Sequence, residues 1–273
     1  MTERGLVETR SLAQKLVMAG QVRVDGQVAA KASEKVLPTT KISVDQPPRF
    51  VSRGGEKLAA ALNIFGLNDL RNKVCVDVGA STGGFTDCML QAGAKKVFSI
   101  DVGYGDFHWK LRNDPRVVLM ERTNARYVKE FSEKIDLAVV DASFISLKVL
   151  LPVIKEWFNE ENGKVIALIK PQFEAGRTEV SRGDGVIRDV GLHRQIVTDV
   201  LGFAEKHGFR TDGIIYSPLI GPKGNKEFLA ILSTQVEVES NLSELIENVF
   251  VNMENGLNIQ ENSEEKEIGG KNE

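Results

Sequence analysis

The 273-residue sequence lacks the features of a membrane, secreted or metal-binding protein. Its longest apolar runs, such as Leu137–Val140 and Val165–Ile169, last only a few residues, whereas a membrane helix needs about 20. No apolar run follows Met1 as in a signal peptide. Cys75 and Cys88 lie in apolar patterns typical of buried thiols, and the three histidines are too scattered to predict a metal site. We therefore expect a cytoplasmic protein that binds neither membrane nor metal.

Charge is unevenly distributed along the chain, although its net value is only −3. Residues 235–273 contain ten Glu and two Lys, which leaves five excess positive charges in the remainder. Residues 1–60 contain ten Lys or Arg against six Asp or Glu, an excess that is compatible with nucleic-acid binding. The composition of residues 235–273 predicts a largely disordered acidic tail, in which only Asn241–Phe250 has the spacing of a short amphipathic helix.

Residues 1–46 have the pattern of a small α+β domain. Arg10–Ala19 has apolar residues at helical spacing and is followed by a glycine that ends the helix. Gln21–Val24 alternates like a strand, and Asp25-Gly26 is a hairpin turn signal. Two prolines then interrupt the pattern, so we predict a linker over residues 47–55.

Residues 56–234 alternate strand-like and helix-like segments. Several of the strands are continuous apolar runs, as expected where helices cover both faces of a sheet. This pattern predicts a Rossmann-like α/β fold, and seven strands with the last two close together favour its methyltransferase variant. The predicted strands are Val74–Val78, Lys96–Asp101, Val117–Glu121, Ile135–Asp141, Lys164–Lys170, Gly213–Tyr216 and Glu227–Ser233, and the predicted helices between them are Gly84–Ala92, Leu147–Phe158 and Gly191–His207.

A glycine-rich turn follows the first of these strands directly. Glycines permit a tight turn and a close approach of the backbone to a ligand, and the next helix supplies free N–H groups. Asp101 ends the next strand at the distance where nucleotide-binding folds place a carboxylate for ribose hydroxyls. Ser81 stands where a dinucleotide fingerprint needs a glycine, which favours S-adenosylmethionine over NAD. The turn comprises Asp77, Gly79, Ala80, Ser81, Thr82, Gly83, Gly84 and Phe85.

Four charged residues stand where a purely structural charge is unusual. Asp141 and Lys170 end predicted strands, Glu227 begins the last strand, and Lys57 opens a helix. The carboxyl ends of parallel strands meet at the ligand crevice. Each charge taken alone is also consistent with an exposed salt bridge, but four together favour catalysis. A lysine with a lowered pKa can remove the proton of a ribose 2′-hydroxyl, and carboxylates can hold that lysine in place.

Five segments of the chain resemble the TlyA family of rRNA ribose 2′-O-methyltransferases, which have an FtsJ-like (RrmJ-like) catalytic domain and are often called hemolysins. The segments are VSRGGEKL, DVGASTGGFTD, VVDASFISL, LIKPQFE and GNKEFLAIL. The resemblance implies that Lys57, Asp141, Lys170 and Glu227 form the catalytic tetrad of that family, with Lys170 activating the hydroxyl. It also implies that S-adenosylmethionine binds to the glycine-rich turn, Asp101, Asn124 and Asp141.

The N-terminal segment resembles the S4-type RNA-binding domain. The likeness implies that Arg10, Lys15 and Arg23 contact RNA phosphates, with Arg4 and Arg53 as further candidates, and that ribosomal RNA is the partner. The same charges also fit an ordinary solvated helix face. Family members carry a further Arg-Leu-Asp run ahead of this segment, so either the domain is shortened here or the natural start lies upstream.

Three alternatives remain open from the sequence. Asp141–Phe144 can be read as a degenerate motif of base-amine methyltransferases, although it lacks their two prolines and gives the lysines no role. The hemolysin label suggests a pore former, which would need a membrane segment or lytic helix. A non-catalytic RNA-binding factor that retains the fold is the third.

Overall fold

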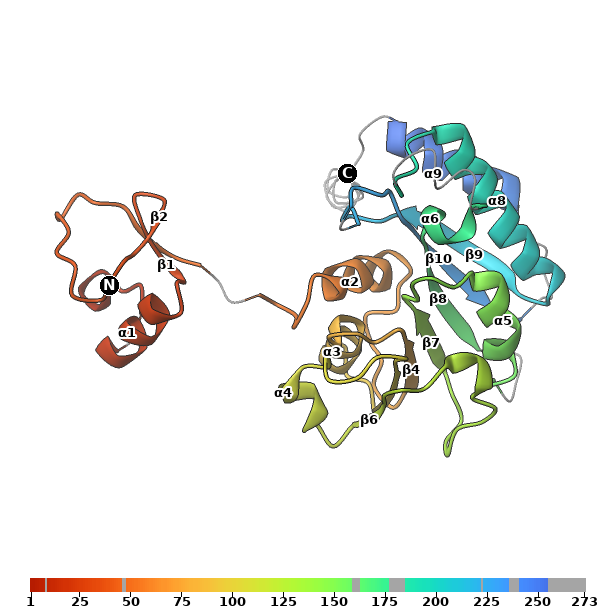
Figure 1. The fold of residues 1–273 in the computed structure, drawn as a ribbon, viewed down its shortest axis with the longest axis horizontal. Helices are drawn as coiled ribbons and strands as arrows, with labels where there is room; N and C mark the ends of the chain where they lie inside the picture. The colour runs from red at the N-terminus through yellow and green to blue at the C-terminus, as the bar shows by residue number, and fades with distance from the viewer. Residues whose placement is uncertain are drawn as a thin grey trace, which may run out of the picture. The chain divides into compact units, whose positions relative to one another are not determined.

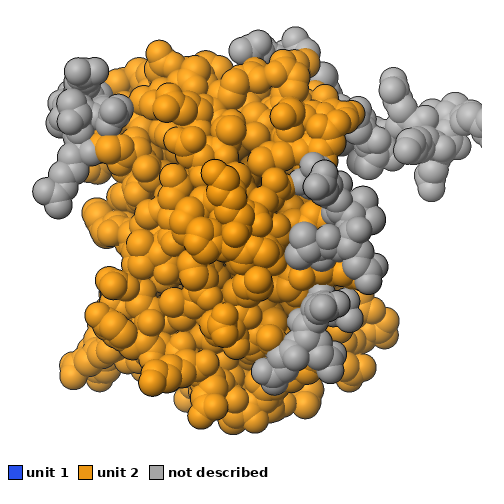
Figure 2. Space-filling view, turned by 90° about the vertical axis from the view of Figure 1, so that its right-hand side faces the viewer, with its two compact units in different colours: residues 1–49 blue, residues 50–273 orange. Residues whose placement is uncertain are grey.

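The chain divides into two units between Arg49 and Phe50 (Figure 1). Figure 2 shows the surface of the second unit in orange. The computed structural model describes residues 1–7, 9–45, 48–158, 163–176, 185–221, 223–235 and 241–254. Each unit is described by itself below. The last residue of the predicted N-terminal domain (46), the first residue of the predicted linker (47) and most of the predicted acidic tail lie outside the described residues.

The first unit contains one α-helix and a three-stranded antiparallel sheet in the order β2-β1-β3. The predicted hairpin is confirmed: Val24 pairs with Gln27, and both turn residues, Asp25 and Gly26, have positive φ. Thr9 caps α1 by accepting a hydrogen bond from the Leu12 N–H. The elements are η1 (Thr2–Arg4), α1 (Arg10–Met18), β1 (Val22–Val24), β2 (Gln27–Val28) and β3 (Ile42–Val44).

The second unit is built on a seven-stranded sheet in the order β6-β5-β4-β7-β8-β10-β9. The strands from β6 to β8 are parallel, whereas β10 is antiparallel to both of its neighbours. This arrangement confirms the predicted seven-stranded α/β fold. The strands are β4 (Val74–Val78), β5 (Lys96–Ile100), β6 (Val117–Met120), β7 (Leu137–Val140), β8 (Lys164–Ile169), β9 (Arg210–Tyr216) and β10 (Phe228–Ser233).

Helices cover both faces of this sheet. Alternate strand residues enter two separate cores: one contains residues of α5, α8 and α9, and the other residues of α2 and α3. Nearly all side chains of the five inner strands are therefore buried, which explains the continuous apolar runs in the sequence. The helices are α2 (Gly54–Ile64), α3 (Gly84–Gln91), α4 (Trp109–Arg112), η2 (Ala125–Tyr127), α5 (Leu147–Lys155), α6 (Pro171–Glu174), α8 (Val190–Lys206) and α9 (Leu242–Glu254).

The structure moves both predicted boundaries of this unit outward. Phe50 is buried, and its ring lies so close to Gly55 that a Cβ there would come within 2.2 Å of it. Residues 50–55 are therefore part of the second unit and not a free linker. At the other end, α9 buries Ile246 and Phe250 against the sheet core, so the unit extends past the predicted end at residue 234.

Among the residues that the structure describes, no helix is both long and apolar enough to span a membrane. Within the same residues, no three His, Cys, Asp or Glu side chains gather as a metal site would require. Cys75 and Cys88 are buried free thiols, and burial raises the pKa of Cys75 to about 12.

Candidate active site

The glycine-rich turn joins β4 to α3 through three residues with positive φ: Gly79, Ser81 and Gly83. Gly79 has φ +86°, and a Cβ at this position would lie 2.6 Å from the carbonyl oxygen of Asp141. A side chain is therefore excluded there by both strain and space. No side chain caps the N-terminus of α3 at Gly83, which leaves N–H groups for an anionic ligand.

Asp77 lies in β4, two residues before the first glycine of the turn. Its carboxylate is completely buried and accepts a hydrogen bond from the Thr86 hydroxyl at 2.6 Å, and Ser99 lies 2.8 Å from the same hydroxyl. The Oδ1 atom of Asp77 has no hydrogen-bond partner within the described structure. Burial raises the pKa of Asp77 to about 7, and Asp141 adds to this effect, whereas the hydrogen bond from Thr86 opposes it.

A cavity of about 540 Å³ opens on one side of the turn. Five residues that are predicted to contact the cofactor line it: Gly79, Ser81, Asp101, Asn124 and Asp141. Asp101 accepts hydrogen bonds from the N–H groups of Ser81 and Gly103, each at 2.7 Å. Its carboxylate therefore fixes both the glycine-rich turn and the loop after β5. The volume lies in the range of small-molecule sites.

A second cavity of about 230 Å³ lies on the other side of the turn. Gly79, Ser81 and Asp141 line both cavities, which makes them one divided cleft. Lys57 and Arg53 line only the second cavity. The turn residues that line it are Gly79, Ala80, Ser81, Thr82, Gly84 and Phe85.

The four predicted catalytic residues form two ion pairs. Lys57 Nζ lies 2.5 Å from Glu227 Oε2, and Lys170 Nζ lies 2.5 Å from Asp141 Oδ1. Both lysines and Glu227 are almost completely buried. Lys170 also donates to the Ser143 hydroxyl at 3.1 Å. Because Lys57 and Asp141 line the same cavity, the two pairs meet at one site.

The antiparallel strand β10 makes this arrangement possible. Phe228 pairs with Ile169 of β8, so β10 begins at the edge where β8 ends. Glu227 therefore enters the site from the same edge as Lys170. Gly221 leaves room for Glu227, since a Cβ on Gly221 would lie 2.6 Å from Glu227 Oε1.

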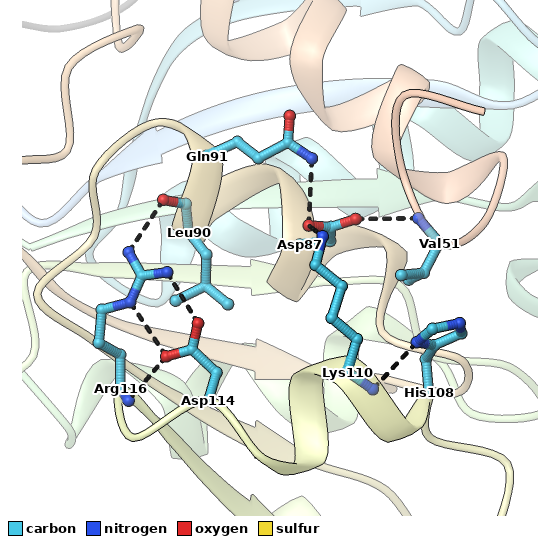
Figure 3. A network of polar contacts seen from close by, with 8 residues as sticks. All are labelled: Val51, Asp87, Leu90, Gln91, His108, Lys110, Asp114 and Arg116. Atoms are coloured by element: carbon cyan, nitrogen blue, oxygen red, sulfur yellow. Dashed lines mark hydrogen bonds and ion pairs between the residues drawn. The ribbon is translucent and has the colours of Figure 1, made fainter. Parts of the chain in front are cut away.

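Helix α2, which carries Lys57, is anchored to α3 by a buried carboxylate (Figure 3). Asp87 Oδ2 accepts the Val51 N–H at 2.9 Å. Its Oδ1 accepts from Gln91 at 3.1 Å and lies 3.9 Å from Lys110 Nζ. The segment before α2 is thereby fixed, which holds Lys57 at the cleft.

Three residues that the sequence analysis did not single out shape the site. Glu174 accepts the Ser146 hydroxyl at 2.5 Å and the Leu147 N–H at 2.7 Å, and thereby joins α6 to the start of α5. Phe144 is 91% exposed with φ +64° and contacts the Phe173 ring. Ser143 and Phe144 belong to the segment Asp141–Phe144, but its sequence does not indicate the contacts of Ser143 with Lys170 and of Phe144 with Phe173.

Two of the five predicted RNA-binding residues already have partners within the first unit. Arg4 donates to the carbonyl oxygens of Leu37, Pro38 and Thr40, and Arg23 pairs with Asp45 at 3.0 Å. Both guanidinium groups thus stabilise the first unit itself. The remaining candidates, Arg10, Lys15 and Arg53, are exposed.

Comparison with known proteins identifies both parts of the chain. Residues 50–234 match the family of FtsJ-like methyltransferases, and residues 1–42 match the S4 domain. The 16S/23S rRNA (cytidine-2′-O)-methyltransferase TlyA of Mycobacterium tuberculosis is 42% identical over 87% of this chain and 89% of its own. The chain belongs to the TlyA family.

Further relatives agree with this assignment. Hemolysin A of Brachyspira hyodysenteriae is 45% identical over 83% of this chain and 94% of its own. A solved structure of a candidate hemolysin from Streptococcus thermophilus, 40% identical, superposes with a TM-score of 0.70 over 93% of this chain and 94% of that one. A TlyA-family protein is a methyltransferase that uses S-adenosylmethionine, and its S4 domain binds RNA.

The residues present fit this cofactor. Because Gly79 has no side chain, a ligand can approach the backbone closely there. The N-terminus of α3, which has no side-chain cap, suits the carboxylate of the cofactor. Asp101 and Asn124 supply polar groups on the wall of the larger cavity. The cofactor contacts of individual residues remain predictions.

Proposed function

We propose that this chain methylates the 2′-hydroxyl of a cytidine in ribosomal RNA. The paired arrangement of Lys57 with Glu227 and of Lys170 with Asp141 carries the proposal, because both pairs adjoin one cleft beside the glycine-rich turn. The relatives named as rRNA cytidine-2′-O-methyltransferases support the same substrate class. A base-amine reaction would leave both buried lysines without a role.

The site residues divide the reaction between them. When bound, S-adenosylmethionine supplies an electrophilic methyl carbon on a positively charged sulfur. Once Lys170 has released its own proton, its neutral amine takes the proton of the 2′-hydroxyl. The oxygen then bonds to that carbon as the carbon–sulfur bond breaks, and the sulfur leaves as a neutral thioether. Asp141 and Ser143 hold the Lys170 amine in position. Lys57, held by Glu227, orients the ribose from the smaller cavity.

We further propose a division of labour along the chain. Residues 1–46 bind RNA through Arg10 and Lys15, which contact phosphates and position the substrate. Arg53 stands at the mouth of the smaller cavity and contacts the phosphate of the target nucleotide. A ribosomal substrate supports the proposal that the protein acts in the cytoplasm.

The test is methyl transfer from tritiated S-adenosylmethionine to isolated ribosomal subunits and intact ribosomes, followed by mass spectrometry of the nucleosides. We expect 2′-O-methylcytidine with the wild-type protein and none with Lys170→Ala. Lys170→Arg should be equally inactive, because arginine cannot release its proton. Lys206→Ala, at an exposed helix position, is the control. Label in a base amine, or activity of Lys170→Ala, would contradict the proposal.

A further inference from the structure

The exposed aromatic side chains of the methyltransferase unit are confined to one edge of its sheet. Among the described residues of 50–254, four aromatic side chains are exposed: Tyr104, Trp109, Tyr127 and Phe144. Each of them lies in the segments that follow the carboxyl ends of β5, β6 or β7. The cofactor cleft opens at this same edge, since it is lined by residues that follow these strands.

Three of these rings lie beside arginines or an imidazole. Arg122 lies 4.3 Å from the centroid of the Tyr104 ring, and Arg126 lies 5.6 Å from that of Tyr127. The Trp109 ring stacks on His108. We call Tyr104, Trp109, Tyr127 and the two arginines the aromatic rim. Among the described residues, neither arginine has a carboxylate within ion-pair distance, although the charge of Arg122 acts on the neighbouring Glu121. Both arginine side chains are exposed.

The segments that carry the rim are fastened to one another. The Arg122 N–H donates to the Gly103 carbonyl at 3.0 Å, and Glu121 accepts the Gly105 N–H at 2.7 Å. Glu121 also accepts from Arg112 at 2.8 Å, which joins helix α4 and thus Trp109 to the same cluster. Arg122 has φ +51°, an unfavourable backbone conformation that the surrounding structure maintains.

Burial does not explain these rings. Tyr104, Trp109 and Tyr127 are 66%, 72% and 74% exposed, so they add little to the core. Residues 102–130 contain six basic and four acidic residues, which gives the segment a positive charge. Exposed rings alternating with arginines are typical of surfaces that stack single-stranded bases and contact the backbone. Arg126 also lines the larger cavity, which makes the rim continuous with the cleft.

We propose that the aromatic rim binds unpaired nucleotides next to the methylated one, by stacking bases on Tyr104, Trp109 and Tyr127. The inference rests on the proposed function, because it names how the RNA substrate of that site is held. Arg122 and Arg126 contact the phosphates between the stacked bases. Stacking tolerates any base, so the rim contributes affinity and leaves the choice of nucleotide to the cleft.

The test compares Tyr104→Ala, Trp109→Ala and Tyr127→Ala with ring-preserving Trp109→Phe and Tyr127→Phe. Each alanine variant should raise the KM for ribosomal subunits about fivefold to a hundredfold, with kcat and S-adenosylmethionine affinity unchanged. The phenylalanine variants should stay within about threefold of wild type. Val251→Ala, at a half-exposed position on α9, is the matched control, because α9 contacts β9 at the other end of the sheet.

A second measurement separates the rim from the reaction. Trp109 is exposed whereas Trp157 is buried, so acrylamide quenching of the full-length protein reports mainly on Trp109. Short oligocytidylate should protect Trp109 from acrylamide quenching in the wild-type protein. This protection should be lost in Tyr104→Ala. If oligocytidylate gives no protection and the alanine variants keep the wild-type KM, the rim proposal is wrong. If wild type transfers no methyl group but protection is seen, the proposed function fails and the rim proposal stands.

Discussion

Lys57 Nζ lies 2.5 Å from Glu227 Oε2, although 170 residues separate the two in the sequence. Both side chains are almost completely buried, so each is the principal compensation for the charge of the other. Removal of one partner from such a pair costs about 3–5 kcal/mol, because an unpaired charge is left in the interior.

The pair predicts a specific pattern of stability changes. Lys57→Ala and Glu227→Gln should each lower the free energy of unfolding by about 3 kcal/mol or more, and both should abolish methyl transfer. The double variant Lys57→Met with Glu227→Leu should recover much of the stability but no activity. Urea unfolding combined with methyl-transfer assays measures both. Equal activity in the wild type and Glu227→Gln would contradict the assigned role.

Gly79 should be required for cofactor binding because a side chain there has no space, an effect that can be separated from backbone strain. Gly79→Ala combines a positive φ with a Cβ that would lie 2.6 Å from the Asp141 carbonyl oxygen. We expect the affinity for S-adenosylmethionine to fall at least tenfold, measured by titration calorimetry. Gly66→Ala is the matched control, because Gly66 has φ +68° and nothing within 4 Å of its Cβ position. Comparable affinity losses in both variants would show that strain alone is responsible.

Asp77 predicts how stability depends on pH. Its pKa is about 7 in the folded protein and 3.8 in an unperturbed chain, so between these values the folded state holds a proton that the unfolded state has released. Its contribution to stability is therefore greatest below about pH 4, falls as the pH rises to about 7, and is constant above that. Asp77→Asn should remove this decline and stabilise the protein at pH 8 by on the order of 1–4 kcal/mol. Thermal unfolding of both proteins across this range tests it, with the exposed Asp199→Asn as control. A wild-type stability that rises between pH 4 and 7 relative to Asp77→Asn would overturn the assignment.

Phe144 should show opposite effects on stability and activity. Its ring is exposed and its φ is +64°, a conformation that costs a bulky residue about 1–3 kcal/mol. Phe144→Gly relieves this strain and should leave the free energy of unfolding unchanged or raise it by up to about 1 kcal/mol. Its methyl transfer to ribosomal subunits should fall at least tenfold, because the Phe144 ring that lines the larger cavity is lost. Phe144→Ala should lose activity equally without the gain in stability.

The sheet was largely predictable because its strands are covered on both faces. The first predicted strand, Val74–Val78, has the same bounds in the structure, and the others agree within a few residues. Asp141, Lys170 and Glu227 were recognisable because they stand at the ends of apolar strands, whereas Lys57 lies on a helix. Their pairing was not, since Lys57 and Glu227 meet only after β10 has entered the sheet.

Other features depend on long-range contacts that a local pattern does not contain. The segment before α2 has the composition of a linker, yet Asp87 and the Phe50 contacts with Gly55 fix it. Helix α9 was recognised only as an amphipathic segment, because its partners in α8 and β9 lie far away in the sequence. Arg4 and Arg23 read as free RNA-binding cations until their intramolecular partners are seen.

The position of β10 in the sheet has a consequence for synthesis of the protein. A ribosome makes the chain from its N-terminus, so helix α2 and Lys57 emerge long before the hairpin of β9 and β10 that brings Glu227. Until then, the emerging chain holds a lysine whose interior position has no counter-charge. Nascent chains that end before residue 227 should therefore remain incompletely folded and inactive, and the enzyme becomes competent only late in its own translation.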